Sequence, residues 1–176
     1  VLIAHPSVPA RTIKELVALA KSRPGKLNYA SAGTGGGTHL TGELFKQVAG
    51  VDIVHIPYKG AAPAVIDVIA GQIQIYFGSA PSVLPNIRAG KLRALGVTTL
   101  NPSGIAPGLP TIASSGLPGY DAATWQGMFA PGKTPAAVIN RINQEVVRVL
   151  NQPDVKEKLF NAGSEVVASS PEEFAA

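Results

Sequence analysis

One segment of the chain, residues 31–39, combines residue types that are suited to holding an anion. It consists of Ser31, Ala32, Gly33, Thr34, Gly35, Gly36, Gly37, Thr38 and His39. A strand-like run precedes it and a helix-like run follows it. In a glycine-rich turn of this kind, backbone N–H groups at a helix N-terminus converge on a carboxylate or a phosphate. We therefore expect the segment, called the glycine loop below, to contact a ligand.

The glycine loop lacks the known phosphate-binding signatures. No Lys-Ser or Lys-Thr pair follows it, as a Walker A loop requires, and Thr38 stands where a dinucleotide fingerprint has its third glycine. This favours a carboxylate. The alternative is a simple helix-entry turn with Thr38 as its N-cap. His39 either braces the loop through a hydrogen bond or contacts the ligand, and a helix N-terminus favours its neutral form.

The sequence offers little acid–base or nucleophilic chemistry near this loop. It contains no Gly-x-Ser-x-Gly elbow and no paired carboxylates in the loops expected beside it. The absence of cysteine excludes thiol catalysis, disulfides and zinc–thiolate sites. His5 and His55 lie in strand-like contexts, where a structural role is expected. We predict binding, with no catalytic residue, no metal and no cofactor.

Composition indicates a globular chain. Hydrophobic residues make up 45% of the 176 residues and charged residues 15%. The net charge is +4, but the basic residues are scattered and form no stripe with interleaved aromatics. Nucleic-acid binding is therefore not expected. No apolar run approaches the roughly 18 residues that a membrane span needs.

Strands and helices alternate over the first hundred residues. Strands are expected at 1–4, 27–30, 53–56, 73–77 and 92–98, and helices at 12–21, 38–49, 63–70 and 82–89. This alternation predicts an α/β fold with a parallel-rich sheet and helices on both faces. Right-handed crossovers would place every strand-to-helix loop at one sheet edge, where ligands bind.

The loops at 31–39, 57–60 and 78–81 should then meet at one crevice. The second and third of these loops add four further candidate ligand-binding residues, Tyr58, Lys59, Gly60 and Ser79. Tyr58 offers a ring and a hydroxyl, Lys59 a cation, and Ser79 a hydroxyl. The alternative for the first two is a packed tyrosine and an exposed lysine.

The last third of the chain has a different pattern. Residues 101–118 are rich in proline and glycine and predict a long irregular connection. Beyond it we expect strands at 124–130 and 165–168 and helices at 134–150, 153–162 and from 171 onward. Thr134 is the expected N-cap of the helix at 134–150, with Pro135 at the first helical position. The apolar faces of these helices need strands that the chain lacks. We therefore expect one nearly complete lobe at 1–120 and a fragment of a second lobe at 121–176.

With these residues in view, the chain resembles the Bug-type, TctC-like solute receptors, the extracytoplasmic binding proteins of tripartite tricarboxylate transporters. The resemblance begins at Asn28 and includes the glycine loop through Leu40. It continues, in collinear order, in the segments 55–60, 63–64, 84–85, 90–95, 110–112 with Gly116, 125–127, 130–131, 134–135 and 171–174. Each piece is short, and their combination is specific.

The resemblance implies a type II periplasmic-binding-protein fold, in which two α/β lobes enclose a cleft. Members bind small organic carboxylates, among them dicarboxylates and tricarboxylates, and deliver them to membrane subunits of the transporter. It implies an exported, periplasmic protein whose signal peptide is not in this sequence. By this comparison residues 1–120 are the second lobe and 121–176 the returning part of the first. The N-terminal half of the first lobe, with its ligand loop, is absent here. We expect that the chain is truncated, that further residues of the protein lie outside it, or that another chain completes the fold.

One local departure from the family bears on the ligand. Many members carry an acidic or amide side chain shortly after the position of Phe77, whereas this chain has Gly78 and Ser79. A carboxylate there could pair with the amine of an amino acid, so its absence makes an amino-acid ligand less expected. Two other functions stay open at this point: the effector domain of a transcription regulator, and an enzyme that acts on a small acid.

Overall fold

The computed structural model describes residues 1–175, and they form two compact units, Val1–Thr124 and a second that begins at Trp125. The division falls close to the expected one at residue 120. The roles expected for the two parts, a ligand-binding lobe and the returning part of another, stay predictions. Among the described residues, no helix is long and apolar enough to cross a membrane.

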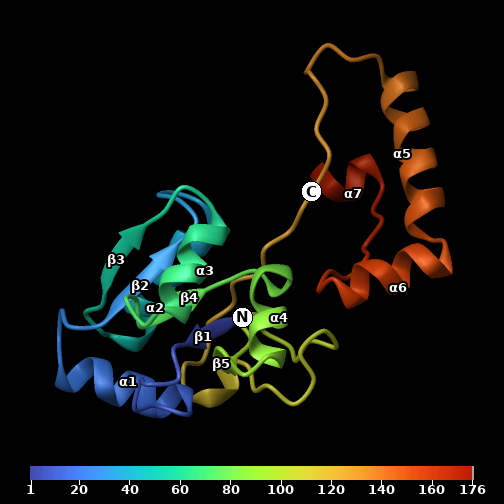
Figure 1. Ribbon diagram of the computed structural model, residues 1–176. Coiled ribbons are helices and arrows are strands. Elements are labelled where there is room, and N and C mark those ends of the chain that lie inside the picture. Colours follow the sequence, from blue (N-terminus) through green and yellow to red (C-terminus); the bar gives the residue numbers. More distant parts are fainter. Residues whose placement is uncertain (176) are drawn as a thin grey trace. The chain divides into compact units, whose positions relative to one another are not determined.

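A five-stranded sheet forms the centre of the first unit. In chain order its strands are β1 (Leu2–Ala4), β2 (Asn28–Ser31), β3 (Val54–Pro57), β4 (Ile75–Phe77) and β5 (Arg93–Gly96). Their order across the sheet is β3-β2-β4-β1-β5 (Figure 1). β2 pairs in parallel with β3 and β4, whereas β1 is antiparallel to β4 and β5.

The reversed β1 corrects one expectation. A loop that follows an antiparallel strand lies at the opposite edge of the sheet, so the strand-to-helix loops do not all share an edge. The loops after β2, β3 and β4 do share one, because these three neighbouring strands run the same way. The glycine loop and the two other candidate loops therefore lie at the same edge.

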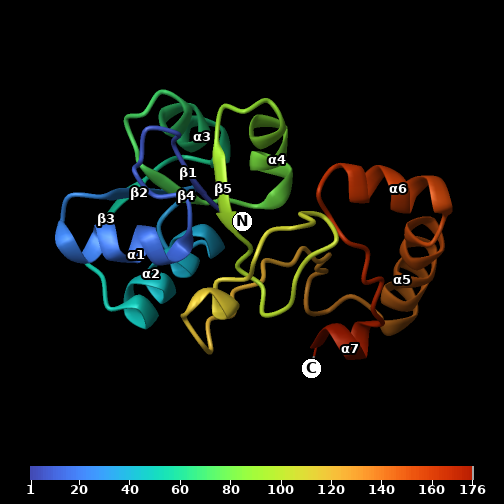
Figure 2. The same ribbon diagram turned by 90° about the horizontal axis from the view of Figure 1, so that it is seen from below.

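Two pairs of helices cover the two faces of this sheet, as the alternating pattern predicted. They are α1 (Ile13–Ser22) and α2 (Gly37–Ala49) on one face, and α3 (Ala61–Ile69) and α4 (Ala80–Arg88) on the other. Figure 2 shows the strands between the two helix pairs. Side chains alternate along the strands accordingly: Tyr29 and Phe77 pack with α2, whereas Tyr76 packs with α3 and α4.

Local sequence explains where α2 runs. The helix ends at Gly50, whose left-handed backbone (φ 60°) is the usual conformation of a helix-terminating glycine. Within the helix, a Cβ at Gly42 would overlap the ring of Tyr29 on β2. The glycine thus allows α2 to approach β2 closely, and the helix N-terminus is held over the end of that strand.

The segment after β5 is irregular, as expected, with a short 3-10 helix, η1 (Ala113–Ser115). It nevertheless belongs to the first unit. Ile112 and Leu117 are buried in the core beneath α1 and α2, and the buried hydroxyl of Tyr120 donates to the carbonyl of Thr41 at 2.9 Å.

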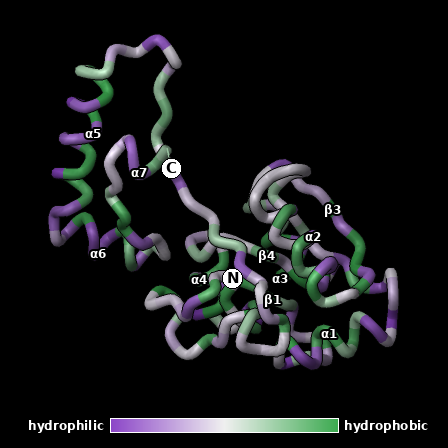
Figure 3. Tube along the Cα trace, turned by 180° about the vertical axis from the view of Figure 1, so that it is seen from behind, coloured by the Kyte–Doolittle hydropathy of each residue, from purple (hydrophilic) through white to green (hydrophobic). Residues whose placement is uncertain are grey.

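The second unit contains helices α5 (Ala136–Leu150), α6 (Pro153–Asn161) and α7 (Pro171–Ala175). Figure 3 shows apolar and polar residues alternating along α5, and Val138, Ile142 and Val149 on it are exposed. The strands expected at 124–130 and 165–168 are wrong, since both segments are irregular. Strands need a hydrogen-bonding neighbour, and within the described residues this unit contains no strand that could supply one.

The expected start of α5 is also wrong by one residue. Pro135 is the N-cap, with φ −58° and ψ 139°, and the helix begins at Ala136. Thr134 instead closes a turn, in which its N–H donates to the carbonyl of Pro131. Because ψ of Pro135 is extended, the helical conformation begins one residue later than expected.

Candidate functional site

The carboxyl end of β2 is the point at which the chain changes sides of the sheet. From β2 the chain enters α2 on one face, whereas from β3 and β4, the strands on either side, it enters α3 and α4 on the other face. Ligands of open α/β sheets bind at such switch points, beyond the carboxyl ends of the strands. The glycine loop begins there, at Ser31.

Hydrogen bonds within the glycine loop fix its shape. The Thr38 hydroxyl accepts the N–H of Ala32 at 2.9 Å, and the buried Ser31 hydroxyl donates to the carbonyl of Gly33 and lies 3.3 Å from its nitrogen. Gly35, in a left-handed conformation (φ 78°), donates its N–H to Nδ1 of His39 at 3.1 Å. The bracing role considered for His39 is therefore present. The alternative in which Thr38 caps the helix is wrong, because Gly36 is the N-cap.

Three backbone N–H groups of this loop have no hydrogen-bond partner among the described residues. They belong to Thr34, Gly37 and Thr38, and the last two are the first helical positions of α2. Thr34 and Gly37 are exposed to solvent. Free N–H groups at a helix N-terminus form a positive, outward-facing surface that suits a carboxylate.

A polar cluster stands behind the loop. The ring of His55 stacks between His39, at 4.0 Å, and Tyr29, at 5.0 Å, and its Nε2 lies 2.7 Å from the Ser31 hydroxyl. Burial, together with nearby His39, lowers the pKa of His55. The expected structural role of His55 is thus seen as support for both Ser31 and His39.

Glu43 holds the far side of this cluster. Its Oε1 accepts hydrogen bonds from the Tyr29 hydroxyl at 2.6 Å and from Lys46 at 3.0 Å. Burial acts to raise the pKa of Glu43, but these two hydrogen bonds outweigh it and the pKa is lowered. The sequence reasoning did not identify Glu43 and Lys46 as part of this cluster. Their spacing of four and seven residues from His39, which places all three on one helix face, could have indicated this role.

The loop after β3 is tied to the glycine loop through its backbone. The N–H groups of Tyr58 and Gly60 donate to the carbonyls of Ser31 and Ala32 at 3.0 and 2.9 Å. The Tyr58 hydroxyl donates to Asp67 of α3 at 2.6 Å, and its pKa is raised to about 12 by burial and by this carboxylate. Lys59 is exposed, and within the described residues its ammonium has no hydrogen-bond or salt-bridge partner.

The loop after β4 brings Ser79 to the same sheet edge, as the N-cap residue of α4. Its hydroxyl does not cap the helix; it donates to the hydroxyl of Ser82 at 3.2 Å. The structure thus places all the candidate loops at one edge. Contact of their residues with a ligand stays a prediction.

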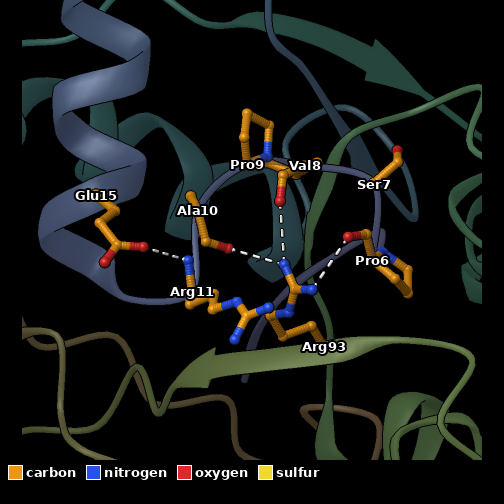
Figure 4. Close-up of a pocket in the computed structure, with 8 residues that line it drawn as sticks. All are labelled: Pro6, Ser7, Val8, Pro9, Ala10, Arg11, Glu15 and Arg93. Carbon is orange, nitrogen blue, oxygen red and sulfur yellow. Dashed lines mark hydrogen bonds between the residues drawn. The ribbon is translucent and has the colours of Figure 1, made fainter.

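A hollow of about 310 Å³ lies at the opposite edge of the sheet, where the loop after β1 passes the start of β5 (Figure 4). Arg93 lines it, but its guanidinium donates to the carbonyls of Pro6, Val8 and Ala10 at 3.0 to 3.1 Å. These bonds occupy the cation, which therefore ties the loop to β5. A second hollow, of about 540 Å³, lies on the outer side of α2 and is lined by residues from Leu40 to Gln47.

Comparison with known proteins extends over the whole chain. The sequence profile described as "Tripartite tricarboxylate transporter family receptor" matches residues 1–176. A UPF0065 protein in the tcbD-tcbE intergenic region of Pseudomonas sp. (strain P51) is 41% identical over 99% of this chain and 52% of its own length. BugT of Bordetella pertussis is 34% identical over 98% of this chain and 53% of its own. The chain thus spans about half the length of these curated relatives.

Solved structures match the fold closely. "R. palustris Rpa4515 with adipate" has a TM-score of 0.94 and 34% identity, over 99% of this chain and 58% of that one. MatC from Rhodopseudomonas palustris with bound malate has a TM-score of 0.87 and 29% identity, over 98% and 58%. The fold is therefore the α/β fold of periplasmic binding proteins, represented in part, as expected.

Proposed function

Since the chain belongs to the tripartite tricarboxylate transporter receptors of the Bug type, we propose that it binds a small organic carboxylate, a dicarboxylate or tricarboxylate or a related acid. The observation that carries the proposal is the set of unpartnered N–H groups of Thr34, Gly37 and Thr38 at the start of α2. A carboxylate that accepts them gains charge-assisted hydrogen bonds in the field of the helix dipole.

The other candidate residues have separate roles in this proposal. Gly33, Gly35 and Gly36 keep side chains away from the anion, and Ser31, Ala32, Thr38 and His39 hold the shape of the loop. The Thr34 hydroxyl and the free Lys59 ammonium add polar contacts from the rim. Tyr58, Gly60 and Ser79 shape the part of the pocket farther from α2.

In the whole protein, this loop forms one side of a cleft. Residues 1–120 act as the lobe that carries the glycine loop, and residues 121–176 as the returning part of the other lobe, which contributes the opposing loop. Closure of the lobes traps the ligand, and the closed receptor delivers it to the membrane subunits in the periplasm. Chemistry on the ligand is not part of this function, since the loops hold no paired acid and base.

The proposal is tested by ligand binding to the full-length protein. Thermal unfolding is followed with succinate, glutarate, adipate, malate and citrate, with inorganic phosphate as the matched anion. We expect at least one of the carboxylates to raise Tm in a concentration-dependent way and phosphate to leave it unchanged. A protein that responds to none of them, or to phosphate equally well, contradicts the proposal.

A further inference from the structure

Thr124 is the last residue of the first unit, and its side chain lies against the start of α2. A Cβ at Gly37, the first residue of this helix, would meet Cγ2 of Thr124 at 3.2 Å. The residue is exposed, and its hydroxyl has no hydrogen-bond partner among the described residues. Since the hydroxyl shares a carbon atom with this methyl group, both stand beside the helix start.

The helix groups to which this hydroxyl could bond are free as well. A hydroxyl at a helix start ordinarily accepts one of the first N–H groups, as N-cap side chains do. Here no side chain caps α2, and the N–H groups of Gly37 and Thr38 have no partner among the described residues. The helix and Thr124 thus each present a donor at this place, and the two are not bonded to each other. A group that accepts from both, such as a carboxylate, fits this arrangement.

The segment that carries Thr124 is held in place on α2. The buried hydroxyl of Tyr120 donates to the carbonyl of Thr41, in the second turn of the helix, at 2.9 Å. The N–H of Ala122 donates to the carbonyl of Thr98 at 2.8 Å. From Tyr120 to Thr124 the chain therefore follows α2 from its second turn to its first residue. A fixed segment places the hydroxyl at the helix start, which lowers the entropy cost of binding through it.

We propose that Thr124 is a further ligand-binding residue, whose hydroxyl donates to the carboxylate at the start of α2. One carboxylate oxygen accepts from the backbone N–H groups of the helix, and the other accepts from the hydroxyl. The methyl group of Thr124 packs against Gly37 and restricts the side-chain rotamer. The inference rests on the proposed function and adds to it a residue outside the three candidate loops, one that follows β5 in the chain.

The inference is tested by calorimetric titration of adipate into the full-length protein, or of the strongest dicarboxylate of the panel if adipate does not bind. Thr124→Val replaces the hydroxyl by a methyl group of similar size and keeps the contact with Gly37. Thr124→Ser keeps the hydroxyl and removes the methyl group. Thr12→Val is the matched control, the same change at the N-cap of α1, where the hydroxyl accepts the N–H of Glu15 at 3.2 Å. Thr12 follows β1 and therefore lies at the opposite edge of the sheet.

We expect Thr124→Val to weaken the binding of adipate about tenfold, which is the order of one hydrogen bond to a charged group. It should leave the Tm of the ligand-free protein unchanged, because an exposed hydroxyl without a partner contributes little to stability. Thr124→Ser should bind adipate more tightly than Thr124→Val, since it keeps the donor. Thr12→Val should show the opposite pattern, with a lower Tm through the lost helix cap and an unchanged affinity.

The inference is overturned if Thr124→Val binds the dicarboxylate as tightly as the wild type does, or if Thr124→Ser binds it as weakly as Thr124→Val. An equal loss of affinity in Thr12→Val would also overturn it, because the effect would then not depend on the place of the hydroxyl. These results all require a wild type that binds a dicarboxylate. A wild type that binds none of the panel overturns the proposed function itself, so the two failures are distinguishable.

Discussion

At the scale of single residues, the glycine loop divides its polar groups between shape and ligand. The hydroxyls of Ser31 and Thr38, which the sequence presented as ligand contacts, are engaged in bonds inside the protein. The groups left free are backbone N–H groups. Sequence shows where glycine and hydroxyl side chains gather, but it does not show which of them the fold uses internally.

His55 makes stability depend on pH in a definite direction. Burial lowers its pKa in the folded protein below the value of about 6.5 that histidine has in an unfolded chain. Between these two pKa values the unfolded chain binds more protons than the folded protein does. The contribution of neutral His55 to the free energy of unfolding is therefore fully present above about pH 6.5 and is lost as the pH falls through the lower, folded-state pKa. We expect the Tm of the protein to fall between pH 7.5 and pH 5.5, measured by circular dichroism.

His55→Gln supplies the comparison for this measurement. The amide can still bond to Ser31 but does not titrate, so the fall in Tm should be smaller than in the wild type. His5→Gln is the matched control, because within the described residues the His5 ring hydrogen-bonds only to Ser7, and the pH profile of this variant should follow the wild type. Equal slopes for His55→Gln and the wild type would contradict this origin of the pH dependence.

At the scale of elements, α2 and its entry depend on two left-handed glycines at opposite ends. Gly35 (φ 78°) lies in the glycine loop and Gly50 (φ 60°) ends the helix, and a Cβ at either would meet no atom within 4 Å. Alanine at each should therefore cost stability through its backbone alone, roughly 1–2 kcal/mol. The two substitutions form a matched pair that differs in distance from the site.

We expect Gly35→Ala and Gly50→Ala to lower Tm by similar amounts. Only Gly35→Ala should lower the affinity of the full-length protein for adipate, measured by calorimetric titration. The reason is that the Gly35 N–H bond to His39 sets the course of the loop. Equal losses of affinity in both variants would show that the loop conformation is not what binds the carboxylate.

Most elements of the first unit follow from sequence, because period and turn residues act locally. Helical spacing of Ile13, Leu16 and Ala20 predicts α1, and the strands emerge as short apolar runs. The direction of β1 does not follow, since pairing partners are set by the whole sheet. The same reason explains why the strand expected at 124–130 is not formed. Its residues have an apolar pattern, but the described part of this unit contains no neighbouring strand.

The candidate site follows from sequence only in outline. The glycine loop and the strand ends could be located, because glycines and strand ends carry recognisable patterns. The cluster of Tyr29, His55 and Glu43 could not, since three elements distant in sequence bring it together.

At the scale of the whole molecule, the first unit carries its own sheet and two apolar layers. It carries the proposed anion-binding helix start as well. The chain spans about half the length of its curated relatives. Affinity is therefore a property to be measured on the full-length protein.

The central claim is that unpartnered N–H groups at the start of α2 bind the carboxylate, and Gly37 allows it to be tested directly. Gly37 is the first helical residue and follows Gly36, whose φ of −77° and ψ of 168° suit a residue before proline. Proline at this position therefore removes the N–H while the helix is kept. Alanine keeps the N–H and adds a Cβ, which would meet Thr124 at 3.2 Å.

The measurement is calorimetric titration of adipate, or the strongest dicarboxylate of the panel, into the full-length wild type, Gly37→Pro and Gly37→Ala. A lost hydrogen bond to a charged group is worth about 1.5–3 kcal/mol, so Gly37→Pro should bind at least tenfold more weakly than Gly37→Ala. Equal dissociation constants for the two folded variants would contradict the account.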